Sequence, residues 1–205
     1  YGNHVGSWNF AATAYLNRWK VKIYYEHYFD DHSQMFFQYG RWKDGHIGLE
    51  ITFPKNRFID TFVYEGLGTK DQTGPMLYDS FWGEFEEQIS AKDNYYNHYL
   101  YQGWQHWGMG IGNPLLPGPI YNKNGQITFI SNRVLAHHIG FCGSPCQSLS
   151  YRMLLSYSRH WGTYDNPLNE IKKQFNSLFE VTYAPQQLKG WSFTVSGAMD
   201  RGNIL

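Results

Sequence analysis

Alternation of apolar and polar residues is the strongest pattern along this chain, and it predicts β-strands. Between Gly45 and Phe53, apolar side chains recur at every second position, including Ile47, Leu49 and Ile51. Because successive side chains of a strand point to opposite faces of a sheet, this period gives one apolar and one polar face. The segment therefore predicts a strand that is buried on one side.

The same pattern recurs along the rest of the chain and predicts about eight strands in all. Some of these segments are less regular, as expected where a bulge or two-sided burial interrupts the alternation. A short helix is indicated at 169–174, where Glu170, Lys172 and Lys173 follow one another closely. The fold class is therefore predicted to be all-β. The predicted strands lie at 8–16, 21–29, 45–53, 58–67, 126–141, 149–157, 175–183 and 191–199.

The connections between these strands are expected to alternate in length. Short ones at 17–20, 54–57, 143–147 and 185–189 alternate with long ones at 30–44, 68–125 and 162–174. Outer-membrane barrels have short periplasmic turns and long extracellular loops, whereas a Greek-key sandwich gives no reason for this order.

We therefore expect residues 1–205 to form a single segment of a large antiparallel up-and-down outer-membrane β-barrel, in preference to a soluble sandwich or a lipocalin-like barrel. The long extracellular loop is expected at 68–125. In this arrangement both ends of the segment lie at the extracellular rim, which predicts that further strands flank it.

The amino-acid composition limits the classes of binding partner that we expect. The chain has 17 Lys and Arg residues and 17 Asp and Glu residues, so its formal net charge is zero and no nucleic-acid partner is expected. Aromatic residues make up 19% of the chain, a content that excludes intrinsic disorder. With an outer-membrane location, lipid becomes an expected partner.

The predicted long loop combines aromatic rings with amide and imidazole groups. Flat rings pack against the apolar faces of sugars while polar side chains satisfy hydroxyl groups, which makes this composition typical of a carbohydrate site. Alternatively, the aromatic residues form a loop core or an interfacial girdle. The candidate polysaccharide-binding residues are Asn94, Tyr95, Tyr96, Asn97, His98, Trp104, His106 and Trp107.

The chain contains two cysteines, Cys142 and Cys146, which enclose the turn sequence Gly-Ser-Pro. They are expected either to form a disulfide across a hairpin or to remain as two free thiols, because the sequence does not give their Cα separation.

No metal site and no cofactor is expected. Common hydrolase, metalloprotease and nucleotide-binding motifs are missing from the sequence, so no enzymatic activity is predicted.

Several longer blocks resemble a known family. They are WKVKIYYEHYFDDHSQMFF at 19–37, GRWKDGHIGLEITFPK at 40–55, DNYYNH at 93–98, HWGMGIGNPL at 106–115, NRV-x-AHH at 132–138 and YSRHWGTYDNP at 157–167. Together they make the chain similar, over nearly its whole length, to the Wzi-like capsule-assembly family of outer-membrane proteins, particularly its Bacteroidota members.

The resemblance implies a barrel of roughly 18 strands, within the range known for such barrels. It also implies a lectin-like, non-catalytic role in holding capsular polysaccharide or exopolysaccharide at the cell surface. A porin-like channel for small solutes is the alternative function.

Overall fold

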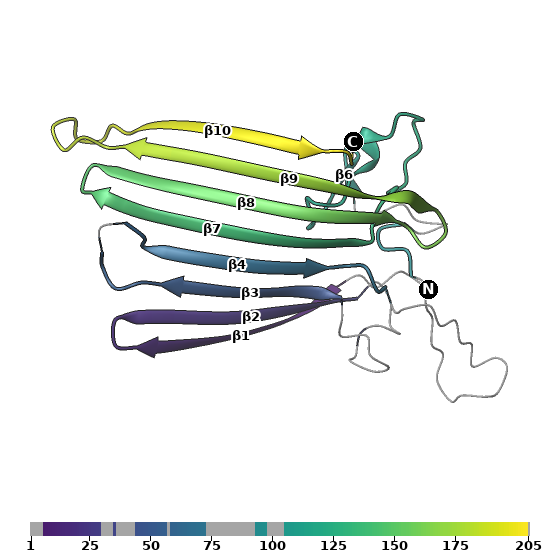
Figure 1. Cartoon of the computed structure of the whole chain (residues 1–205), viewed down its shortest axis with the longest axis horizontal. Helices are drawn as coiled ribbons and strands as arrows, with labels where there is room; N and C mark the ends of the chain where they lie inside the picture. Colours follow the sequence, from purple (N-terminus) through teal and green to yellow (C-terminus); the bar gives the residue numbers. More distant parts are fainter. Residues whose placement is uncertain are drawn as a thin grey trace.

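A computed structural model describes residues 6–29, 35, 44–56, 58–72, 93–97 and 105–204 of the chain. Eight long strands form one antiparallel sheet in the order β1-β2-β3-β4-β7-β8-β9-β10, so strands that follow one another in this series are neighbours (Figure 1). The strands are β1 (Gly6–Leu16), β2 (Trp19–Phe29), β3 (Gly45–Thr52), β4 (Thr61–Gly68), β7 (Val134–Cys146), β8 (Leu149–Gly162), β9 (Pro167–Tyr183) and β10 (Phe193–Gly202). The predicted all-β, up-and-down architecture is thus confirmed at the level of the sheet.

Two further elements and a short helix lie between β4 and β7. β5 (Gln105–His106) and β6 (Met109–Gly110) pair as a small hairpin, and a 3₁₀ helix follows at Pro119–Tyr121. No helix in the described part of the chain is long and apolar enough to cross a membrane. The strands β1 and β10 form the two edges of the large sheet (Figure 1).

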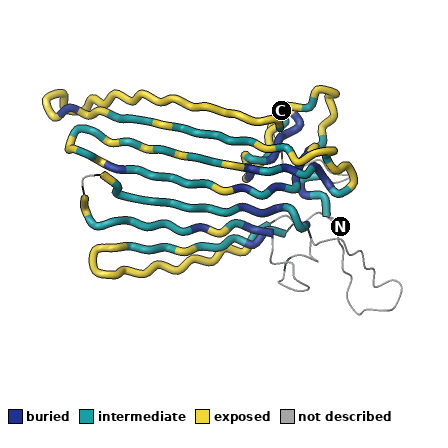
Figure 2. The backbone as a smooth tube through the Cα atoms, in the orientation of Figure 1, coloured by how far each residue is buried: buried dark blue, intermediate teal, exposed yellow. Residues whose placement is uncertain are grey.

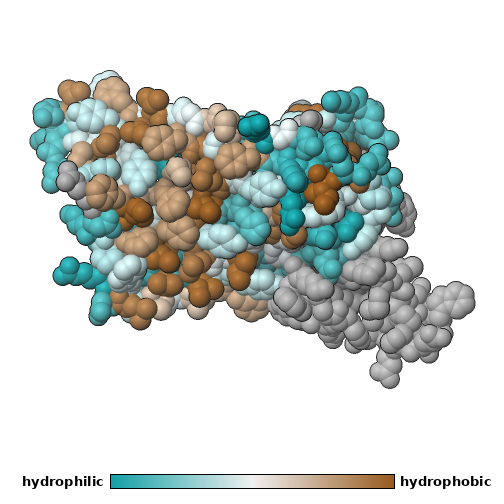
Figure 3. Space-filling model, viewed as in Figure 1, coloured by the Kyte–Doolittle hydropathy of each residue, from teal (hydrophilic) through white to brown (hydrophobic). Residues whose placement is uncertain are grey.

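The register sorts side chains onto two chemically different faces, because residues directly opposite each other in paired strands share a face. On what we call the apolar face, two successive rows cross the middle of all eight strands, and neither contains a charged residue. Figure 3 shows apolar side chains gathered over the middle of the strands, between hydrophilic side chains at both ends. The two rows are Ala12, Ile23, Leu49, Tyr64, Ile139, Leu155, Ser177 and Met199, and Ala14, Val21, Ile51, Phe62, Phe141, Met153, Phe179 and Gly197.

The opposite face, which we call the polar face, carries most of the charged residues of the strands. Two ion pairs cross it: Lys20 Nζ lies 3.4 Å from Glu50, and an Arg152 nitrogen lies 3.3 Å from Glu180. The polar face also includes Lys22, Glu26, His46, Glu65, His138, Ser156, Asn176 and Asp200.

The two ends of the sheet also differ. We call the end with the β1–β2, β3–β4, β7–β8 and β9–β10 connections the turn end, and the opposite end the loop end (Figure 1). Buried residues gather at the loop end, whereas β1 and β10 are largely exposed (Figure 2). The buried hydrophobic cluster consists of Leu67, Leu116, Phe129, Val134 and Ala136, so it joins the sheet to the segment that precedes β7.

The structure corrects several sequence predictions. The helix expected at 169–174 is wrong, because these residues belong to β9. The connection between β8 and β9 is consequently only 163–166, shorter than the 184–192 connection at the turn end, so the strict alternation of connection lengths is wrong there. Residues 126–133, expected to begin a strand, precede β7, which starts at Val134.

The expected turn at 143–147 also lies elsewhere. β7 continues to Cys146, with a register irregularity between Gly143 and Cys146, and the turn falls at 147–148. A strand bulge accommodates the proline of this segment, because it interrupts the hydrogen-bond ladder locally. Cys142 and Cys146 therefore lie on one strand and do not face each other across a hairpin; both are free thiols.

Candidate functional site

The segment 105–133 lies against the polar face at the loop end of the sheet. Its Leu116 and Phe129 pack with Leu67 and Ala136, which belong to β4 and β7. Both of these strand residues are on the polar side, because their partners in the register alternate with the apolar rows. The polar face is therefore covered by chain at one end.

Amide side chains join this segment to residues 94–97. Asn132 is fully buried and donates hydrogen bonds to Asn94 Oδ1 at 2.6 Å and to the Tyr95 carbonyl at 2.7 Å. Asn97 exchanges two hydrogen bonds with the Phe129 backbone, each 2.8 Å long. Burying an amide is costly unless it is hydrogen-bonded. These contacts therefore specify one position for residues 94–97 and 129–132, which we call the loop base.

Asp44, immediately before β3, holds a second part of the loop base. Its carboxylate accepts hydrogen bonds from the Tyr95 hydroxyl and from the backbone amides of Asp71 and Gln72. Burial raises the pKa of the Asp44 carboxyl to about 6, although the hydrogen bonds act in the opposite direction. A single carboxyl group thus joins three parts of the chain that are distant in sequence.

These contacts change the interpretation of the predicted sugar-binding residues. Asn94, Tyr95 and Asn97 are engaged in the loop base, and the Tyr95 ring is only 5% exposed. Tyr96 packs on Phe129 at 5.0 Å between ring centres and donates to the Ile111 carbonyl. The rings of Tyr95 and Tyr96 therefore have structural roles, in line with the loop-core alternative.

The remaining candidates fall into two groups. His98 and Trp104 lie outside the described residues. His106 and Trp107 lie at the tip of the β5–β6 hairpin, and Trp107 is 82% exposed. Its ring meets that of His106 edge-on, with ring centres 6.0 Å apart.

Trp107 also has an unusual backbone conformation. It has a φ of 53°, and Gly108 after it has a φ of 77°, as in the tight hairpin turns that favour Asn-Gly. A bulky residue with positive φ costs of order 1–3 kcal/mol. The hairpin nevertheless has a fixed place, because the Ile120 amide donates to the Gly108 carbonyl at 3.0 Å. A strained conformation thus presents a large ring to solvent.

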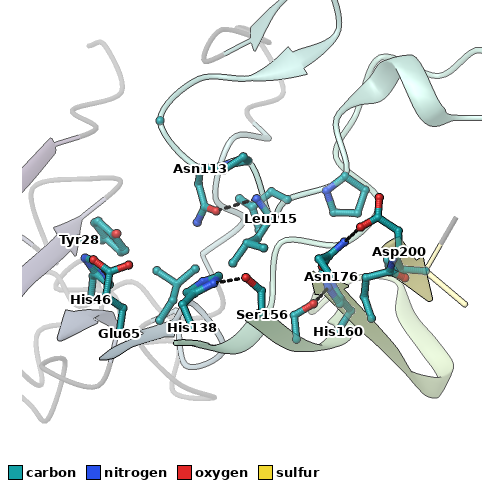
Figure 4. A pocket seen from close by; sticks show the side chains of 18 of the residues that line it. Tyr28, His46, Glu65, Asn113, Leu115, His138, Ser156, His160, Asn176 and Asp200 are labelled. Atoms are coloured by element: carbon teal, nitrogen blue, oxygen red, sulfur yellow. Dashed lines mark hydrogen bonds and ion pairs between the residues drawn. The ribbon is translucent and has the colours of Figure 1, made fainter. Parts of the chain in front are cut away.

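A cavity of about 760 Å³ lies between the polar face and the segment 112–117 (Figure 4). Its volume is in the range of roughly 300–1,000 Å³ typical of small-molecule sites. A neighbouring cavity of about 300 Å³ shares Glu26, Tyr28, Gly112 and Asn113 with it and extends towards β1. Both open beside the loop base.

Polar side chains of the sheet supply most of the charged and hydrogen-bonding groups that line the larger cavity. His46 lies between two carboxylates, 3.5 Å from Glu65 and 3.9 Å from Glu26. Across the cavity, the Asn176 amide donates to Asp200 at 2.6 Å (Figure 4). The described lining thus contains three carboxylates and no Lys or Arg.

Two further histidines, His138 and His160, line the same cavity. His138 and Ser156 are 2.7 Å apart (Figure 4), and the His160 ring lies 2.9 Å from the Ser158 hydroxyl. His160 is only 2% exposed, and its Nδ1 has no hydrogen-bond partner in the described structure. A buried polar atom of this kind is suited to a hydrogen bond with a ligand or an ordered water.

No protein-family model, curated protein or solved structure matches the chain.

Sequence reasoning missed this cavity. Alternation alone placed His46, Glu50 and similar residues opposite the apolar positions, but it gave no distances between strands. Only the register brings Glu26, His46 and Glu65 together from three successive strands. Within the described residues, no group of three or more His, Cys, Asp or Glu side chains is arranged to hold a metal ion.

Proposed function

We propose that this chain is part of an outer-membrane β-barrel that holds capsular polysaccharide or exopolysaccharide at the cell surface, in a lectin-like and non-catalytic manner. The observation that carries the proposal is the division of one sheet into an apolar face whose central rows are uncharged and a polar face that lines a cavity. A strand that alternates in this way fits lipid on one side and a polar barrel interior on the other.

The exposed apolar face supports the membrane part of the proposal. Large hydrophobic side chains are open to solvent on it, among them Ile23 at 55% and Phe179 at 51% exposure. An apolar surface of this extent is uncommon on soluble monomers and indicates contact with lipid or protein. Aromatic residues of the apolar face near both ends of the strands, such as Trp8 and Phe29 at the loop end and Trp19 and Phe193 at the turn end, match the girdles of membrane barrels.

The two edges of the sheet support a larger barrel. β1 and β10 are long and exposed, and an unpaired edge of this length promotes aggregation unless another strand covers it. Strands from the rest of a barrel remove both edges at once. The resemblance to the Wzi-like family, which implies roughly 18 strands, is consistent with this arrangement.

The loop geometry favours polysaccharide binding over conduction. In an open channel the polar face lines a water-filled path. Here the segment 105–133 packs against that face at the loop end, and the cavity of about 760 Å³ lies between the two. Steady open-channel current from the full-length protein in a planar bilayer, with no polysaccharide binding, would instead support the porin-like alternative.

Two features of the loop end suit a carbohydrate. Trp107 offers an exposed flat ring, and the cavity offers carboxylate, amide and imidazole groups for hydroxyl groups. Because the described cavity lining includes Glu26, Glu65 and Asp200 without a Lys or Arg, neutral and amino-sugar units fit it better than uronic acids. A stacking contact contributes about 1 kcal/mol, so strong retention depends on repeated contacts along a polymer.

Replacement of Trp107 tests the site. Trp107→Ala in the full-length protein should weaken binding of the purified polysaccharide about fivefold, the equivalent of about 1 kcal/mol. Trp107→Phe should retain part of the affinity. Ile127→Ala is the matched control, because Ile127 is 59% exposed in the same segment but has no flat ring. Equal binding by wild type and Trp107→Ala, measured by surface plasmon resonance, would exclude this residue from the site.

A further inference from the structure

Charged residues on the apolar face are confined to the loop end. Among the paired strand positions of this face, only Arg159, Lys173 and Arg201 carry a charge. Arg159 is directly opposite Lys173 in the β8–β9 register, and Arg201 is opposite Phe175, the second residue after Lys173. Three basic side chains on adjacent strands therefore border the apolar rows on one side.

These basic groups have no acidic partner among the ion pairs of the described residues. Arg159 instead lies over the ring of Trp161, 5.3 Å from its centre, and Lys70 Nζ lies 4.7 Å from the same ring. Lys20 and Arg152, on the polar face, are by contrast both paired with glutamates. Within the described residues, the positive charge on the apolar side thus has no carboxylate partner.

A groove of about 500 Å³ connects this charge to the apolar surface. Its lining includes Lys173 and Arg201 together with Tyr157, Phe175 and Met199. Lys173 and Arg201 are exposed, so their charged groups are accessible. One groove therefore offers two cations at its loop end and apolar side chains along the strands below.

We propose that this groove, with Arg159 beside it, binds the phosphate-bearing headgroup of an acylated glycolipid in the outer leaflet. The cations contact the phosphate groups, and the acyl chains lie along the apolar rows towards the turn end. Basic side chains at the level of lipid headgroups attract anionic lipid, and long apolar surface beside them selects a lipid over a free anion. The inference rests on the membrane part of the proposed function and is independent of polysaccharide binding.

The test measures retention of bisphosphorylated lipid A by the full-length protein in phosphatidylcholine nanodiscs, using native mass spectrometry. The combined substitution Arg159→Gln, Lys173→Gln and Arg201→Gln should weaken retention about 100-fold, because each basic residue contributes about 1 kcal/mol at an anionic surface and 1.4 kcal/mol is tenfold. Lys173→Gln alone should weaken it about fivefold. The matched control, Lys20→Gln with Lys22→Gln and Arg152→Gln, removes the same charge from the polar face and should have little effect.

Three further outcomes would overturn the proposal: equal retention of dephosphorylated lipid A, displacement of the lipid by excess inorganic phosphate, or an equal loss in the polar-face control. Flotation of each protein with lipid vesicles is measured in parallel. A protein that floats but retains no lipid A contradicts this site alone. A wild-type protein that does not float contradicts the membrane part of the proposed function.

Discussion

Two neighbouring alanines in β1 provide a matched test of the two faces. Ala11 is opposite Tyr24 on the polar face, and Ala12 is opposite Ile23 in an uncharged row of the apolar face. Both are exposed and both lie at the middle of the 11-residue strand Gly6–Leu16. Replacing each with lysine therefore introduces the same side chain at nearly the same depth and differs only in the face it occupies.

The expected cost follows from that depth. Eleven residues at about 3.4 Å per residue, tilted by about 40°, span about 29 Å, so the proposed membrane barrel places Ala12 within about 3 Å of the bilayer midplane. A lysine facing lipid there costs about 2–4 kcal/mol. Ala11→Lys should cost less than about 1 kcal/mol, because it faces the polar side, where its two diagonal neighbours, Glu26 and Lys22, carry opposite charges.

Guanidinium unfolding of the full-length protein from lipid vesicles, followed by tryptophan fluorescence, gives both free energies of unfolding. We expect Ala12→Lys to be less stable than Ala11→Lys by at least about 2 kcal/mol. Equal destabilisation by the two substitutions would refute the assignment of the faces, because a soluble sheet exposes both alanines to water.

Three further predictions concern the loop base and the thiols. Asn132→Ala removes hydrogen bonds from two acceptors, one of them the carbonyl of the buried Tyr95, so it should lower the local stability by about 2–3 kcal/mol and increase proteolysis of the segment 105–133. Unchanged proteolysis would show that these bonds do not fix the loop. The folded-state pKa of Asp44 is raised from 3.8 to about 6, so its stabilisation is complete below about pH 4 and is lost as the pH rises through 6. Amide exchange of Gln72, corrected for its intrinsic pH dependence, should therefore be slower at pH 5 than at pH 7.5, and the reverse order would contradict the burial effect. Thiol titration of the denatured chain without reductant should count both Cys142 and Cys146, whereas a count of zero would show that they are bridged.

The strands were predictable where one face is apolar and the other polar. Gly45–Phe53 was predicted almost to the residue, because β3 spans Gly45–Thr52. At 169–174 the alternation disappears, and a helix was predicted in error. β9 extends here beyond the apolar rows, so neither face needs apolar side chains and the sequence loses its period.

The loop site was less predictable, for a different physical reason. The aromatic and amide composition indicated a binding site in this segment, but Tyr95 and Asn97 serve its internal packing. Their partners, Asp44 and Phe129, are more than 30 residues away, and no local pattern encodes such a contact. The cavity was missed likewise, since register and loop position together create it.

The central claim is that the apolar face contacts lipid while the polar face does not. Nitroxide labels at Lys22→Cys and Ile23→Cys, in a Cys142→Ser and Cys146→Ser background, report this directly by electron paramagnetic resonance. In vesicles, the label at position 23 should collide mainly with oxygen, which concentrates in lipid, and the label at position 22 mainly with a water-soluble nickel complex. Preferential collision of both labels with the nickel complex would contradict the account, because it would place both faces of the sheet in water.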